Sequence, residues 1–300
     1  MIYKVRHATR YVYGSPVDLA VHTVRVQPRA LPFQRVVATE LLVEPPPARR
    51  RDALDHFGNH VTWLFHDAAH PSFEVTAVSE VEVRFPDPPP PEATPAWEKV
   101  VEAANAGGPG GGPGREAWRA AEFRFGSPMC PAHAGAGEYA RKSFTPGRPV
   151  LAGLLELNER IYTEFKFRAG VTTLSTPVSQ VLERREGVCQ DFTHLMCSAL
   201  RCLGIPARYT SGYIRTRPPP GQKRRQGADQ SHAWVGAWMG PEHGWVDLDP
   251  TNGIVVKEEH VVLGWGRDYG DISPVRGVIL GGGTDSLKVG VDLVPADEWE

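Results

Sequence analysis

The stretch Gly187-Val188-Cys189-Gln190-Asp191-Phe192-Thr193-His194 decides the fold of the second half of the chain, because it opens the strongest helical pattern in the sequence. Apolar residues recur at helical spacing beyond it until Gly204, which ends the pattern. The spacing therefore predicts a helix over 189–203 with Cys189 in its first position. Gly187 gives the backbone the freedom to turn sharply into this helix.

Cys189 differs from the other cysteines in its place on the predicted helix. A thiol at a helix start faces the positive end of the helix dipole and unpaired N–H groups, and both favour the nucleophilic thiolate. Cys197 and Cys202 fall inside the apolar helical stretch, where a free cysteine packs as a small hydrophobe. Disulfides are not expected in a cytosolic chain, and no Cys-x-x-Cys pair supports a zinc ribbon or a redox site.

A thiol nucleophile needs a base and a group that orients the base, and two later strand patterns supply candidates. His232 lies in the alternating segment 231–238, 43 residues after Cys189. Asp247 and Asp249 follow at hairpin distance, so one carboxylate can lie beside the imidazole and fix its tautomer. Both aspartates have the same strand parity, so the spacing leaves both as candidates. The order of helix start, strand and strand predicts a Cys-His-Asp site.

The chain divides by pattern into three predicted parts: an N-terminal β-rich domain at 1–86, a Pro/Gly-rich connection with weak helices at 87–148, and a catalytic domain at 149–300. Alternating apolar and polar residues predict several strands before residue 86. Six prolines in 86–95 end the sheet pattern. Helical patterns then precede strand patterns, which predicts an α+β fold rather than repeated βαβ units.

Composition excludes several classes of protein. The 300-residue chain is 41% hydrophobic and 23% charged, with a net charge of −2, as expected for a globular protein without a nucleic-acid partner. A short basic run, Lys223-Arg224-Arg225, reads as a solvated loop. The absence of a signal-peptide pattern or a long apolar run predicts a cytoplasmic protein with no membrane partner. No acidic loop resembles a calcium site, and no cofactor or metal is expected.

Three segments of the sequence resemble the signature segments of the transglutaminase-like superfamily. The first is 187–194, the second is Ser231-His232-Ala233-Trp234-Val235, and the third runs from Gly244-Trp245 through Asp249-Pro250-Thr251-Asn252. The N-terminal segment 3–29 resembles the β-rich domain that precedes the catalytic core in bacterial members. The resemblance therefore covers most of the chain.

The resemblance implies a papain-like, transglutaminase-like core, with a cysteine-bearing helix packed on an antiparallel sheet that carries the histidine and the aspartate. It implies Cys189 as nucleophile, His232 as base and Asp249 as the residue that orients the base. The implied enzyme is a thiol-dependent amidase, protease or transglutaminase that acts on a protein or peptide through a thioester. Hydrolysis and amine transfer both stay open.

Two other functional classes compete with this interpretation. A non-catalytic binding module would share the fold, and a metal site would use Cys189, His194, His232 and Asp249, although their spacing matches no familiar zinc pattern.

Several neighbours are also candidates for the site. The backbone N–H of Cys189 is a candidate oxyanion donor, and the aromatic residues that can line the site are Tyr209, Tyr213, Trp234, Trp238 and Trp245.

Overall fold

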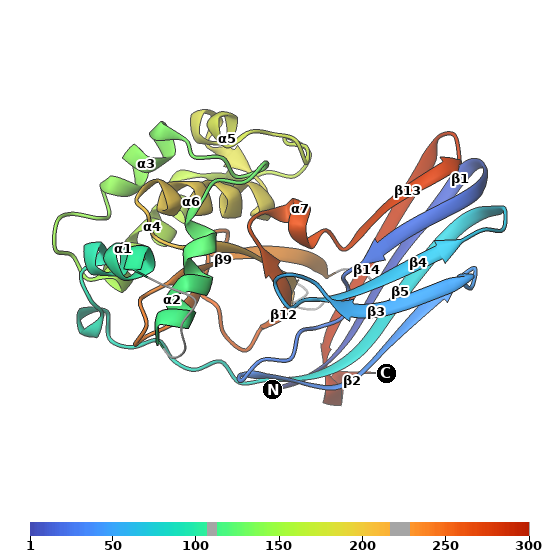
Figure 1. The fold of residues 1–300 in the computed structure, drawn as a ribbon, viewed down its shortest axis with the longest axis horizontal. Helices are drawn as coiled ribbons and strands as arrows, with labels where there is room; N and C mark the ends of the chain where they lie inside the picture. The colour runs from blue at the N-terminus through green and yellow to red at the C-terminus, as the bar shows by residue number, and fades with distance from the viewer. Residues whose placement is uncertain (107–112, 217–228, 300) are drawn as a thin grey trace, which may run out of the picture.

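The structure is a computed structural model that describes residues 1–106, 113–216 and 229–299. A large antiparallel sheet lies beside a second unit made of helices and a smaller sheet (Figure 1). Among the described residues, no helix is long and apolar enough to cross a membrane. The basic run at 223–225 and most of the Gly/Pro stretch at 107–114 lie outside the described residues.

Helices and strands alternate irregularly along the chain. The helices are α1 (Trp97–Ala106), α2 (Pro113–Ala121), α3 (Ala134–Arg141), α4 (Val150–Glu164), α5 (Val178–Arg184), α6 (Cys189–Cys202) and α7 (Tyr269–Ile272), with short 3-10 helices η1 (Pro91–Ala93), η2 (Glu122–Arg124) and η3 (Ala296–Glu298). The strands are β1 (Ile2–Val24), β2 (Gln34–Glu44), β3 (Arg49–Leu54), β4 (His60–His66), β5 (His70–Val83), β6 (Lys166–Phe167), β7 (Glu186–Gly187), β8 (Ala207–Ile214), β9 (Gln230–Trp238), β10 (Trp245–Asp249), β11 (Ile254–Val255), β12 (His260–Gly266), β13 (Val275–Gly281) and β14 (Asp285–Pro295).

The large sheet is built around the long strand β1. Its order is β2-β5-β1-β4-β3, and β13 and β14 pair with the other edge of β1. The predicted division assigned residues after 149 to the catalytic domain, whereas the structure pairs 275–295 with the N-terminal sheet. The physical reason is that the free edge of β1 presents a row of backbone groups that need partners, and two late strands supply them.

The smaller sheet, in the order β11-β10-β9-β8-β12, carries the strands predicted to bear the histidine and the aspartate. Helix α6 packs against β8 and β9, which confirms the predicted α+β core with the cysteine-bearing helix on a sheet. The helices of 97–141 also belong to this core, because they bury residues such as Val100, Ala117 and Tyr139 in the same cluster as Leu195. Small residues permit this packing: a Cβ at Gly137 would lie 2.8 Å from Cys202 Cβ.

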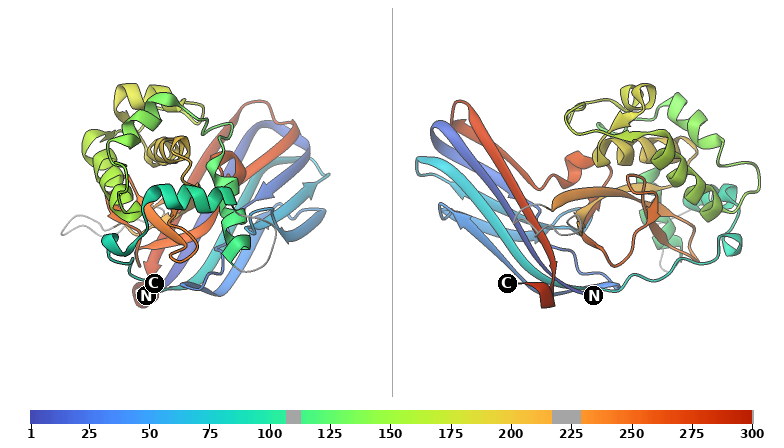
Figure 2. Two further views of the ribbon diagram at one scale, coloured as in Figure 1. Left: turned by 60° about the vertical axis from the view of Figure 1, so that its left-hand side comes forward. Right: turned by 180° about the vertical axis from the view of Figure 1, so that it is seen from behind.

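The two units lie side by side (Figure 2). Buried side chains from both units contact one another. The phenol of Tyr213 on β8 lies 2.7 Å from His7 Nδ1 on β1. Gln34 is fully buried, and its side-chain amide bonds both the N–H and the carbonyl of Val262 at 2.7 Å each. An apolar cluster that includes Val5 of the large sheet and Leu263 of the smaller sheet continues this contact. The units are therefore joined by a common core.

Three buried imidazoles predict that the protein loses stability in mild acid. Burial lowers the pKa of His7, His22 and His194 to about 4 each. In the unfolded chain these imidazoles bind protons near pH 6.5, whereas in the folded protein they do so only near pH 4. The free energy of unfolding therefore falls as the pH is lowered from 6.5 toward 4. We expect a loss of about 2 kcal/mol per imidazole between pH 7 and pH 5.

Urea unfolding at the two pH values measures this loss. A denaturation midpoint that does not change between pH 7 and pH 5 would contradict the prediction. Asp249 does not complicate the comparison, because a carboxyl group with a lowered pKa loses its stabilising effect only below its ordinary range.

Candidate active site

Cys189 begins helix α6, as the sequence predicts. The helix start is closed by Asp191, whose carboxylate accepts hydrogen bonds from Val188 N at 2.8 Å and from Thr172 Oγ1 at 2.7 Å. Gly187 leaves room for that carboxylate, because a Cβ there would lie 2.8 Å from Asp191 Oδ2. The glycine is thus required by close approach, and Asp191 has a capping role.

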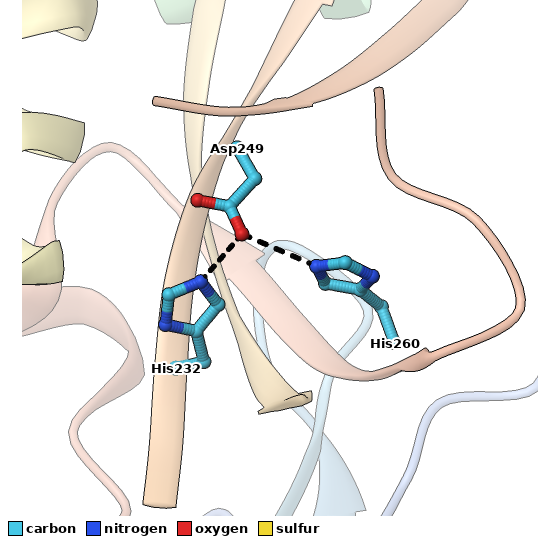
Figure 3. Close-up of side chains that lie close together, drawn as sticks. All are labelled: His232, Asp249 and His260. Carbon is cyan, nitrogen blue, oxygen red and sulfur yellow. Dashed lines mark hydrogen bonds and ion pairs between the residues drawn. The ribbon is translucent and has the colours of Figure 1, made fainter. Parts of the chain in front are cut away.

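His232 on β9 and Asp249 at the end of β10 form a buried pair (Figure 3). The distance between His232 Nε2 and Asp249 Oδ2 is 2.7 Å, and the aspartate is fully buried. An ionised carboxylate only accepts hydrogen bonds, so Nε2 carries the proton. Asp247 has the same parity, but its Oδ1 lies 3.5 Å from the Arg208 guanidinium. The structure therefore brings Asp249, rather than Asp247, to the imidazole.

The Asp249 carboxylate is held by more groups than His232 alone. Its Oδ1 accepts from Thr251 N at 2.9 Å and Asn252 N at 3.2 Å, and its Oδ2 accepts from Asn252 Nδ2 at 2.7 Å. His260 Nε2 lies 3.3 Å from the same Oδ2 (Figure 3). Burial would raise the pKa of Asp249, but the hydrogen bonds from His232 and His260 lower it. Asp249 is thus fixed as an anion.

The imidazole of His232 stays protonated at neutral pH. Burial would lower its pKa, but hydrogen bonding to Asp249 and to Cys189 raises it to about 10. Because Nε2 is bonded to Asp249, Nδ1 is the nitrogen that is left for the sulfur. The arrangement is therefore able to move a proton between Cys189 and His232 while Asp249 holds the ring.

The other residues proposed around the site lie in different environments. Tyr209 packs in one apolar cluster with Cys189, whereas Tyr213 bonds His7 away from the thiol. Trp234 is fully buried and its ring meets His260 edge-on at 5.2 Å. The other two tryptophans pack at the main core: Trp238 within it and Trp245 against it.

The proposed metal set does not come together as named. His194 Nε2 accepts from Tyr269 N at 3.2 Å. Within the described residues, three possible ligand atoms lie within 4.8 Å of one another, on His232, Asp249 and His260. Hydrogen bonds to the shared aspartate oxygen account for that grouping.

His260 and Asn252 are the site residues that sequence reasoning missed. Asn252 had a signal, because an Asp followed by Thr and Asn in a turn is typical of a side chain that bonds the backbone ahead of it. His260 had none, because it begins a strand on the far side of the sheet and meets Asp249 only in three dimensions.

Replacing His260 with phenylalanine is expected to lower the turnover of the site about ten- to hundredfold. The ring packing on Trp234 is kept, while a hydrogen bond to a charged carboxylate, worth about 1.5–3 kcal/mol, is lost. Steady-state kinetics measures the effect, and circular dichroism checks the fold. A variant as active as the parent would show that His260 has no role in holding Asp249.

Two family models and several curated relatives match the sequence of this chain. The family described as the bacterial transglutaminase-like N-terminal region matches residues 3–82, and the transglutaminase-like superfamily matches residues 138–250. An uncharacterized Mycobacterium tuberculosis protein, Rv2569c, is 39% identical over an alignment of 300 positions that covers 98% of this chain and 92% of the relative. The chain belongs to the transglutaminase-like superfamily. A Mycobacterium leprae relative is 32% identical over 97% of both chains.

A solved structure resembles this transglutaminase-like protein along its whole length. A Cytophaga hutchinsonii protein, suggested to be a cysteine protease, superposes with a TM-score of 0.71 at 21% identity and covers 99% of this chain and 92% of its own. That likeness shows the fold. A protein-glutamine gamma-glutamyltransferase of Pseudomonas aeruginosa is 38% identical over 72 residues, which are 24% of this transglutaminase-like chain and 11% of the relative.

Proposed function

We propose that the protein is a thiol-dependent enzyme that transfers acyl groups from amide bonds, with Cys189, His232 and Asp249 as its triad. The observation that carries the proposal is the buried 2.7 Å pair of His232 and Asp249 beside a thiol at a helix start. A protonated imidazole that interacts with that thiol is the state that a thiolate–imidazolium pair requires.

The chemistry proceeds in two steps through a thioester. The Cys189 sulfur attacks the carbonyl carbon of an amide, and the Cys189 N–H at the helix start donates to the oxyanion. His232 gives its proton to the departing nitrogen, so the C–N bond breaks and the acyl group stays on sulfur. Water or an amine then attacks the thioester, which yields an acid or a new amide, and the thiol is restored.

The choice of substrate rests on the relatives. The Pseudomonas aeruginosa protein named a protein-glutamine gamma-glutamyltransferase matches only part of this chain, and it favours a glutamine side chain as the acyl donor. A peptide bond is the second candidate, favoured by the full-length likeness to the Cytophaga hutchinsonii structure. The protein or peptide partner and the cytoplasmic location stay predictions.

One experiment separates the possible reactions. The protein is incubated with a library of glutamine-containing peptides, with and without a primary amine, and the products are read by mass spectrometry. Chain cleavage indicates a protease, conversion of glutamine to glutamate indicates deamidation, and an added amine indicates transfer. Cys189→Ala is expected to abolish every product, and a fully active Cys189→Ala protein would rule out the thiol mechanism.

Thiol labelling tests the site without a substrate. Cys189 is partly exposed, whereas Cys130 and Cys197 are fully buried, so iodoacetamide is expected to label Cys189 first. Cys202 is also partly exposed, and Cys202→Ser is the matched control that should keep the labelling. A binding module on the same fold would label Cys189 no faster than the equally part-exposed Cys202.

A further inference from the structure

Two rows of side chains cross the face of the large sheet that is turned toward α7. One row joins Arg276, Thr23, Trp63 and Arg51 across β13, β1, β4 and β3; the next joins Val278, Val21, Phe65 and Arg49. Residues directly opposite one another in an antiparallel pair share a face, so these eight form one surface. We call this surface the arginine-rimmed patch.

The patch is hollowed and apolar along its middle. Two adjoining grooves of about 510 and 270 Å³ lie on it, and both are lined by Val21 and Trp63. Val21 is 41% exposed and Val278 is 77% exposed. Apolar side chains that stand open side by side along a groove are typical of a surface that a partner covers.

The charge of the patch is positive because its acids are already neutralised. Asp55 lies 3.1 Å from Arg25, and Asp271 lies 2.8 Å from Arg267. The ion pairs found among the described residues include none for the three rim arginines, Arg49, Arg51 and Arg276. The guanidinium of Arg51 instead lies 5.8 Å from the centre of the Trp63 ring. Guanidinium groups at both ends of an apolar groove complement carboxylates.

Helix α7 lies between the helical unit and the large sheet (Figure 1), and its residues contact both the larger groove and the cluster around the thiol. Gly270 and Asp271 line the larger groove. Tyr269 and Ile272, on the same short helix, pack in the apolar cluster that includes Cys189. One turn of helix therefore forms a wall of the groove and also packs beside the thiol.

We propose that the arginine-rimmed patch docks an acidic, apolar-containing extended peptide segment of the substrate. The proposal rests on the proposed function, because it assigns the substrate class of that same site. Carboxylates of the peptide pair with Arg49, Arg51 and Arg276, while its apolar side chains cover Val21 and Trp63. A hollow beside α7 fits a peptide held near the thiol.

Peptide binding tests the proposal apart from catalysis. The full-length Cys189→Ala protein is titrated into a fluorescein-labelled ten-residue peptide of alternating Glu and Leu, and anisotropy is recorded. The triple variant R49E/R51E/R276E is expected to bind at least about tenfold more weakly. Each exposed charge pair contributes only a modest free energy, but the loss of three pairs adds up to about a factor of ten in affinity. Val278→Ser is expected to weaken binding about two- to threefold through lost apolar contact.

The controls define what is specific. Arg141→Glu, an exposed charge reversal on α3, is expected to bind within twofold of the parent. A Lys/Leu peptide is expected not to bind, and added salt is expected to weaken the Glu/Leu complex. Circular dichroism shows that each variant is folded.

Three results would overturn the proposal. The first is a triple variant that binds the Glu/Leu peptide as well as the parent does. The second is a parent protein that does not bind the peptide but needs the three arginines to sediment with anionic phospholipid vesicles. The third is a dimer of the parent that the charge reversals dissociate in sedimentation. Failure of the proposed function looks different, because an unreactive Cys189 would leave peptide binding intact. Conversely, if the peptide does not bind while iodoacetamide labels Cys189 normally, the docking proposal is wrong and the proposed function is unaffected.

Discussion

Asp249→Asn is expected to lower kcat of the proposed amide reaction by about 10³–10⁴-fold, the size of effect seen when the orienting aspartate of a triad is neutralised. Asp249 Oδ2 faces donors from His232, His260 and Asn252. In Asp249→Asn, an amide NH₂ group in the place of Oδ2 cannot accept hydrogen bonds from these donors. His232 then turns its unprotonated Nε2 toward the amide and its N–H toward the sulfur, which is the wrong tautomer for a base.

The pH dependence of kcat/KM separates this cause from a loss of structure. The pKa of His232 is about 10 in the parent, so the imidazolium that protonates the leaving nitrogen is present up to that pH. Without the anionic partner, the alkaline limb of kcat/KM, which reports groups of the free enzyme, is expected to move down from near pH 10 toward pH 6.5. A limb that stays near pH 10 in Asp249→Asn would show that Asp249 does not hold the proton.

Asp247→Asn is the matched control for this experiment. It has the same strand parity, but its carboxylate pairs with Arg208 rather than with the imidazole. The change costs stability by weakening a buried ion pair. The alkaline limb of kcat/KM is expected to stay near pH 10 in the folded protein.

Gly212→Ala is expected to destabilise the fold by more than about 4 kcal/mol, an exceptional cost for one methyl group. Gly212 lies on β8 between Val262 of β12 and His232 of β9. A Cβ at this position would overlap the Val261 carbonyl oxygen and the Trp234 ring. Moving either group costs free energy, because the carbonyl belongs to the sheet backbone and the indole is fully buried.

Thermal and urea unfolding measure this effect, with Gly135→Ala as the control. A Cβ at Gly135 would lie 3.1 Å from a Leu182 methyl group and 3.2 Å from the His133 ring, at the ends of side chains that can shift. The control is expected to change the free energy of unfolding by less than about 1 kcal/mol. A Gly212→Ala protein as stable as this control would show that β8 and β12 tolerate separation.

The helix and strand that carry the candidate chemistry were predictable because their signals are local. The predicted helix over 189–203 compares with α6 at Cys189–Cys202, and the alternating segment 231–238 lies within β9 at Gln230–Trp238. A helical period with a terminal glycine is enough to predict the helix, and period-2 alternation is enough to predict the strand. The resemblance to the superfamily chose Asp249, which strand parity alone left beside Asp247 as an alternative.

The helices of the predicted connection at 87–148 had weak signals for a physical reason. They are short and rich in alanine, and Ala104, Ala120 and Ala140 are buried although alanine is only weakly apolar. Together with Val100 and Tyr139, these small side chains join the same core as Leu195. Such packing is set by the partner helix and leaves a faint pattern in the sequence.

Local periodicity and side-chain chemistry were enough to identify the α+β class, the helix that begins at Cys189 and the strands that bear His232 and Asp249. Long-range contacts made the other choices. Strands β13 and β14 joined the N-terminal sheet because β1 offered a free edge, and His260 reached Asp249 across a sheet. Contacts between residues far apart along the chain depend on which surfaces meet after collapse, and no periodicity encodes that meeting.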